Sequence, residues 1–313
     1  MGSLREPCDY TGRREVIRAA FASAILAGAV MTATPAKAQT AGDIDALNLV
    51  LNMEYLLAQF ESAAVAAAVP ADRLTGNGIA GVAVRGGAAV SFSDTVLRSM
   101  VQEMANDNRN HLLPIRNVIG ALSVRQPLID ISVSSTAPFS VLMQQAGVVG
   151  AGATFNPYAS EENFLYAMFF LKNVSVATYR GLASTISNRV VVQNFTGLLG
   201  AEAIHLATIR SYLYARGATN QRLRDNADKI AAYQNSLNGG GVFQGVSPRT
   251  RTTAVSASPI TVANIAPAQS DGAVSGRSAG QMLNQFYLSS AATASGGFFP
   301  EGVNGTIRTS ASA

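Results

Sequence analysis

The chain has 313 residues, of which 48% are apolar and 13% are charged. This composition can bury a substantial core, so it excludes intrinsic disorder and predicts one large domain, alone or with an appendage. The formal charge is +4, but beyond residue 38 it falls to 18 basic against 16 acidic residues. Such a weak positive charge gives no support to nucleic-acid binding.

The first 38 residues have the pattern of an export signal. Basic residues precede an apolar segment from Ala19 to Met31, and Ala36-Lys37-Ala38 forms an A-x-A cleavage motif. The pair Arg13-Arg14 favours twin-arginine export of a folded chain, and an ordinary secretory signal is the alternative. We therefore expect a periplasmic or secreted protein.

Cleavage after Ala38 would also remove Cys8, the single cysteine of the chain. The mature protein would then contain neither a disulfide nor a reactive thiol, and packing would have to stabilise it. Since only the N-terminal apolar stretch approaches membrane-spanning character, we predict no transmembrane segment in the mature chain.

Four segments of the mature chain carry the apolar spacing of amphipathic helices. They run from about Asp43 to Ala68, from Ser93 to Leu122, from Ser160 to an end near Gly181, and from Asn188 to Ala215. A long connection over 123–158, with a strand-like piece at 129–134, separates the second helix from the third. The sequence therefore predicts an all-α fold, a four-helix bundle with a long crossover between its two pairs.

The last hundred residues differ in character from the bundle. A polar helix is predicted over 221–237 and a last helix over 279–292, with a Gly-, Ser-, Thr- and Pro-rich stretch over 238–275 between them. Large apolar residues are too few for a second core, so this extension should pack on the bundle. The predicted organisation is an export signal at 1–38, the bundle at 39–217 and an irregular C-terminal extension at 218–313.

Polar side chains interrupt the apolar stripe of every predicted bundle helix. An ionisable group away from water is costly unless it is paired, hydrogen-bonded or bound to metal, so these positions point to a buried cluster. His111 and His205 are the only histidines of the chain. The side chains are, in order, Glu54 on the first helix, Asn108 and His111 on the second, Lys172 on the third, and Glu202 and His205 on the fourth.

The sequence Glu202-Ala203-Ile204-His205 has the E-x-x-H spacing, which places a carboxylate and an imidazole one turn apart on one face. In di-iron carboxylate bundles two helices each supply a Glu and the other two each supply such a pair. The placement of this motif on the fourth helix, with His111 on the second and Glu54 on the first, matches that scheme. Glu61 and Glu103 are interpreted as solvated or bundle-end residues.

Four segments of the mature chain together carry a family pattern. They are ALNLVLNMEYLLAQFE at 46–61, FFLKNVSVATYRG at 169–181, LLGAEAIHLATIRSYL at 198–213 and GGFFPEGVNG at 296–305. In these segments the chain resembles the ferritin-like superfamily, and in particular the desiccation-related protein family with its secreted bacterial relatives. The resemblance spans nearly the whole mature chain.

The resemblance implies six metal ligands, of which this chain keeps four. Glu54, His111, Glu202 and His205 match the family pattern as a remnant metal site. Asn108 stands where an acid is expected three residues before His111, and Lys172 occupies the position of the remaining carboxylate. Asp107, four residues before His111, could replace the missing acid as a ligand after a small rotation of the helix. Simple loss of the ligand at Asn108 is the favoured interpretation.

The lost acids make a di-iron centre unfavourable. Two Fe(II) ions bring four positive charges, whereas two carboxylates remain and one ammonium is added. Lys172 could pair with Glu54 and Glu202 in a metal-free network, or a single divalent ion could bind the remnant ligands. We expect no resident cofactor, with iron or another divalent metal as the alternative.

The expected function is that of an exported ferritin-like protein with a structural or stress-protective, non-enzymatic role. A metal-binding protein or di-iron-type oxidase using the remnant site is the alternative. The composition identifies no partner and does not decide between a monomer and a homo-oligomer. A G-x-S-x-G string at 276–280 lacks both a preceding buried strand and a following histidine, so it is interpreted as a loop entering the last helix and not as a hydrolase motif.

Overall fold

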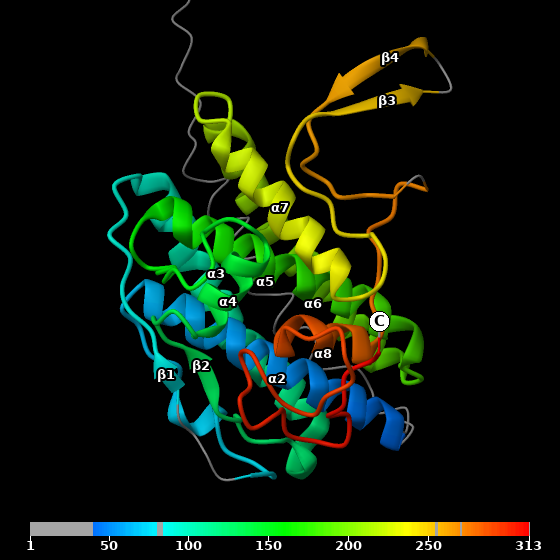
Figure 1. Cartoon of the computed structure of the whole chain (residues 1–313). Helices are drawn as coiled ribbons and strands as arrows, with labels where there is room; N and C mark the ends of the chain where they lie inside the picture. The colour runs from blue at the N-terminus through cyan, green and yellow to red at the C-terminus, as the bar shows by residue number, and fades with distance from the viewer. Residues whose placement is uncertain (1–39, 80–83, 254–255, 270, 313) are drawn as a thin grey trace, which may run out of the picture. The chain divides into compact units, whose positions relative to one another are not determined.

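The structure is a computed structural model that describes residues 40–79, 84–253, 256–269 and 271–312. Four long helices form its centre: α2 (Ala41–Ala64), α3 (Thr95–Ile119), α5 (Glu161–Leu182) and α6 (Arg189–Arg216). α2 packs on α3 and α5, and α6 packs on α5 and α3, which closes a four-helix bundle (Figure 1). The predicted all-α fold with a long crossover is confirmed. Among the described residues, no helix is both long and apolar enough to cross a membrane.

Polar caps fix where the bundle helices begin. Thr40, Asp94, Ser160 and Asn188 each accept a backbone N–H of the first turn that follows. Because the first N–H groups of a helix lack intrahelical acceptors, these side chains supply the missing partners. The predicted second and third helix starts lie within two residues of the observed ones.

The third helix ends at Leu182, one residue after Gly181, close to the predicted end. A Cβ at Gly181 would lie 1.9 Å from the carbonyl oxygen of Arg277, so glycine is required by close approach of the chain. At this contact the backbone N–H of Arg277 donates to the carbonyl of Ala177 at 2.9 Å. The glycine therefore admits the C-terminal extension to the side of α5.

The long connections contain short elements that the periodicity did not predict. β1 (Val84–Gly86) lies between α2 and α3 and pairs in parallel with β2 (Ile129–Ile131). α4 (Pro138–Gln145) follows in the crossover. In the Gly- and Ser-rich stretch, β3 (Arg249–Thr253) and β4 (Ser256–Val262) form an antiparallel pair (Figure 1).

The C-terminal extension contributes two helices that pack on the bundle. α7 (Arg222–Ser236) contacts α5 and α6, and α8 (Ala279–Tyr287) contacts α5. α8 ends five residues before the predicted Ala292, and Leu288 caps it in a left-handed conformation. At its start Ser278 forms a capping box with Gln281, which confirms that the G-x-S-x-G string is a loop entering this helix.

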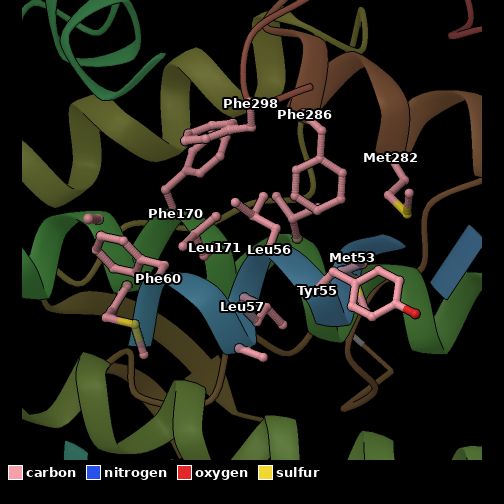
Figure 2. Close-up of a cluster of buried hydrophobic side chains, with 14 of the residues drawn as sticks. Met53, Tyr55, Leu56, Leu57, Phe60, Phe170, Leu171, Met282, Phe286 and Phe298 are labelled. Carbon is pink, nitrogen blue, oxygen red and sulfur yellow. The ribbon is translucent and has the colours of Figure 1, made fainter. Parts of the chain in front are cut away.

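Side chains of the extension enter the same core as the bundle helices. Figure 2 shows Phe286 and Phe298 beside Leu56 of α2 and Phe170 of α5. The Phe298 ring centroid lies 4.8 Å from that of Phe139 and 5.9 Å from that of Phe170. The chain after α8 is therefore part of the core and covers the bundle through aromatic contacts.

Truncation of this aromatic anchor should destabilise the whole fold. Phe298→Ala is expected to lower the free energy of unfolding by about 3–5 kcal/mol, because the Phe298 side chain is fully buried and leaves a cavity. Phe298→Leu keeps most of the volume and should cost less than half of that. Urea unfolding followed by circular dichroism measures both, and equal stability of Phe298→Ala and the parent would refute the shared core.

Candidate metal centre

The bundle helices bring the polar stripe residues together in the interior. Glu54, Lys172 and Glu202 are fully buried, and His111 and His205 are 7% and 5% exposed. Each helix contributes at least one of these side chains, as the periodicity predicted. The convergence follows from their positions on the inward faces, because residues three, four or seven apart share one side of a helix.

Lys172 lies at the centre of the cluster. Its Nζ is 2.8 Å from Oε1 of Glu61, and 3.0 and 3.1 Å from the two carboxylate oxygens of Glu202. A further contact of 3.3 Å joins Nζ to Oδ1 of Asn108. Burial disfavours the charged amine, but the adjacent Glu202 and Glu61 carboxylates outweigh it and hold the pKa of Lys172 above its ordinary value.

The ammonium pairs with Glu61 and not with Glu54, which corrects our expectation for the partners of Lys172. Glu61 was interpreted as a solvated or bundle-end residue, and that interpretation is wrong because its side chain is fully buried. Its Oε1 also accepts a hydrogen bond from Nδ2 of Asn108 at 3.0 Å. Burial raises the pKa of Glu61, and Lys172 only partly offsets that shift. Glu103 is exposed, as expected.

Glu202 is the most heavily bonded carboxylate of the cluster. Besides Lys172, it accepts a 2.6 Å hydrogen bond from the hydroxyl of Ser175, and Nδ1 of His205 lies 3.4 Å from its Oε1. Burial alone would raise its pKa, but the positive charges of Lys172 and His205 and the hydrogen bond from His205 lower it. Glu202 is therefore ionised and held in place by its neighbours.

Two nearly parallel imidazoles flank Glu202. The rings of His111 and His205 are inclined by 14° with centroids 6.4 Å apart. Nε2 of His205 lies 3.2 Å from Oδ2 of Asp107. Burial and the Lys172 charge lower the pKa of His205, but its hydrogen bonds to Asp107 and Glu202 outweigh them and raise it to about 9. Asp107 is thus a partner of the imidazole.

On the other side of Glu202, Glu54 and His111 form a second pair. Nδ1 of His111 lies 3.3 Å from Oε2 of Glu54 and 3.7 Å from Oε1 of Glu202. The hydroxyl of Tyr179 donates to Oε1 of Glu54 at 2.6 Å. Burial lowers the pKa of His111, but the Glu54 carboxylate more than offsets this, so the net shift is upward.

The buried cluster contains as many acidic as basic side chains, and Asp107 adds a part-exposed carboxylate beside His205. Three carboxylates, Glu54, Glu61 and Glu202, face three basic side chains, Lys172, His111 and His205. Because each buried charge needs a counter-charge or strong hydrogen bonds, this balance can sustain the cluster in a low-dielectric interior. We refer to these six residues as the buried charge network.

The residues do not fit a pair of metal ions. The Nζ of Lys172 is within hydrogen-bond distance of both Glu61 and Glu202, so a positive charge already occupies the space between the carboxylates. Asn108 supplies a neutral amide where a bridging or terminal carboxylate would be needed. Two divalent ions would add four positive charges beside an ammonium that already pairs with two of the carboxylates.

One divalent ion has a narrower set of candidate ligands. Ligand atoms of Glu54, His111 and Glu202 all lie within 4.8 Å of one another, and all three residues are buried. Oε2 of Glu54 and Nδ1 of His111 have no hydrogen-bond partner of good geometry among the described residues. His205 lies outside this triad and contacts Asp107. The four-residue remnant site thus remains a prediction.

Comparison with known proteins agrees with this architecture. A family model described as a ferritin-like domain matches residues 42–215, which is more than half of the chain and covers all four bundle helices. The chain belongs to the ferritin-like family. The resemblance inferred from the sequence motifs is thereby confirmed, and no solved structure shows a significant match to this chain.

Two curated relatives of this ferritin-like chain are similar at low identity. "Ferritin-like catalase Nec2" of Nesocodon mauritianus is 26% identical over 275 residues, which cover 85% of this chain and 84% of the relative. "Desiccation-related protein PCC13-62" of Craterostigma plantagineum is 26% identical over 205 residues, which cover 64% of each chain. These matches support the desiccation-related branch of the family.

Proposed function

We propose that this chain is an exported ferritin-like protein in which the buried charge network has replaced the di-iron centre, and that its role is structural or stress-protective and not enzymatic. The observation that carries the proposal is the position of Lys172, whose ammonium joins Glu61 to Glu202 across three helices of the bundle. An ammonium cannot supply the open coordination positions or electrons that oxygen chemistry requires.

An assay for oxidation and peroxide turnover tests this proposal. Purified chain loaded anaerobically with Fe(II) and then exposed to oxygen or hydrogen peroxide should show no reaction above a Glu202→Ala control. The same absence is expected for peroxide decomposition, even though one relative is named a catalase. Turnover that requires Glu202 would refute the non-enzymatic role.

The exported location rests on the N-terminal sequence pattern. Residues 1–38 lie outside the described residues, so the signal peptide and twin-arginine motif stay predictions. Cell fractionation should place the chain outside the cytoplasm, without Arg13 and Arg14, and an Arg13→Lys/Arg14→Lys variant should accumulate inside if export uses the twin-arginine route. Full-length chain in the cytoplasm of the parent strain would contradict export.

A second function, binding of one divalent metal ion, is favoured by the Glu54–His111–Glu202 triad. The triad supplies two carboxylates and one imidazole, a donor set that suits first-row divalent metals. Titration with Zn²⁺ or Mn²⁺ distinguishes the alternatives. One tightly bound ion per chain that is lost in Glu54→Gln would support the single-metal role, whereas the charge network predicts no tight binding.

A further inference from the structure

A pocket of about 330 Å³ lies where the crossover, α5 and α7 meet, and the proposed function does not use it. The first two turns of α5 contribute Asn163 and Tyr166, and the first two turns of α7 contribute Arg222 and Asn226. The crossover contributes a further part of the lining, from residues 148, 149 and 154–156. This volume is at the lower end of the range of about 300–1,000 Å³ seen for small-molecule sites.

Four asparagines line this space, which we call the amide pocket: Asn156, Asn163, Asn220 and Asn226. Two are fixed by the fold. Nδ2 of Asn163 donates to the carbonyl of Asn156 at 2.9 Å, and Nδ2 of Asn226 donates to the hydroxyl of Tyr166 at 3.2 Å. The hydroxyl of Tyr166 in turn lies 3.4 Å from the carbonyl oxygen of Arg222, to which it donates. The polar wall is therefore pre-positioned.

Asn226 presents an unused acceptor in this wall. The residue is only 4% exposed, and within the described part of the chain its Oδ1 accepts no hydrogen bond, whereas its Nδ2 is bonded to Tyr166. Because Asn226 lines the pocket, this oxygen can accept a hydrogen bond from a bound molecule. A hydroxyl group can donate this hydrogen bond.

The charges that line the pocket do not favour an ion of either sign. One carboxylate, Glu162, and one guanidinium, that of Arg222, line it, so their formal charges cancel. Glu162 also lies 3.4 Å from Arg216, but Arg216 is closer to Asp94 and Glu161, so Glu162 keeps much of its charge. A phosphate would be attracted by Arg222 and repelled by Glu162, and an ammonium the reverse, so neither ion gains net attraction to offset its loss of hydration.

From this geometry we propose that the amide pocket binds a neutral, hydroxyl-rich small molecule, of the size of a mono- or disaccharide. Together the amides offer both N–H donors and carbonyl acceptors, as hydroxyl groups require. The lining also includes the apolar residues Val148, Val149 and Phe155, which can pack against the C–H face of a sugar ring. This proposal does not depend on the absence of metal chemistry.

Ligand-observed NMR and calorimetry with purified full-length chain test the proposal. Maltose and sucrose serve as neutral probes, maltohexaose tests for a polysaccharide end, and glucose 6-phosphate and glucosamine serve as charged probes. The neutral sugars should bind with a Kd of about 1–10 mM and more tightly than either charged sugar. Tighter binding of maltohexaose than of maltose would indicate that the pocket binds the end of a polysaccharide and not a free small sugar.

Three variants test whether the sugar binds in the amide pocket. Asn226→Leu removes the unused acceptor, and Asn220→Trp fills the pocket from an exposed position that should not affect folding. Each should raise the Kd at least tenfold, while Asn117→Leu at an exposed site on α3 should leave it unchanged. Absence of neutral-sugar binding at about 50 mM, preference for a charged sugar, or full binding by folded Asn220→Trp would overturn the proposal.

Discussion

Replacement of Lys172 by methionine is expected to lower the free energy of unfolding by about 3–5 kcal/mol. The substitution keeps most of the side-chain volume but leaves Glu61 and Glu202 buried beside each other without the ammonium that joins them. For a domain of this size the loss corresponds to a decrease in Tm of roughly 10 °C. Calorimetry or thermal circular dichroism of the purified chain measures it.

Two controls separate the charge effect from packing. Lys229→Met removes an exposed lysine whose contact is a 3.1 Å hydrogen bond to the carbonyl of Gly147, so its Tm should change little. Lys172→Met/Glu202→Gln removes one charge of each sign and should recover part of the lost stability, because fewer unpaired carboxylates remain. If Lys172→Met were as stable as Lys229→Met, the ammonium would not be balancing buried charge.

The double substitution Asn108→Glu/Lys172→Glu is expected to create affinity for two metal ions. It restores the second E-x-x-H pair on α3 and the carboxylate on α5, and it replaces the cation at the centre of the network with an anion. Without metal, the added negative charge should destabilise the fold, and Fe(II) or Mn²⁺ should raise its Tm by mass action. Metal analysis after anaerobic loading should find about two ions per chain.

The two single variants are matched controls for metal binding by the double variant. Asn108→Glu retains the ammonium and should bind no metal pair, and Lys172→Glu lacks one expected ligand and should bind more weakly than the double variant. A double variant that folds, as judged by circular dichroism, yet binds no metal would show that the missing carboxylates are not what prevents metal binding in the parent chain. The same conclusion would follow if the parent chain bound two ions.

Local sequence signals were sufficient for the bundle but not for the connections. Apolar spacing and capping residues such as Asp94 and Ser160 define long helices, because both signals act within a few residues. β1 and β2 are three residues each and are held by pairing between distant segments, so no local period reveals them. Phe298 likewise enters the core through a turn whose path depends on tertiary contacts.

The sequence predicted most residues of the buried cluster, but it did not predict which acid pairs with which base. Glu61 is seven residues after Glu54, and this spacing already placed it on the same stripe, so the signal for its burial was present. The choice of Glu61 and not Glu54 as the partner of Lys172 depends on the reach and rotamer of one long side chain. Tyr179 meets Glu54 instead, a contact that periodicity cannot specify.

The most direct test of the central claim is a crystal structure of the parent chain soaked anaerobically with ferrous salt, with anomalous scattering recorded at the iron edge. If the buried charge network replaces the di-iron centre, no pair of anomalous peaks should appear among the bundle helices, and Nζ of Lys172 should contact both Glu61 and Glu202. Two well-occupied iron ions between these helices, with Lys172 displaced from the carboxylates, would contradict the claim.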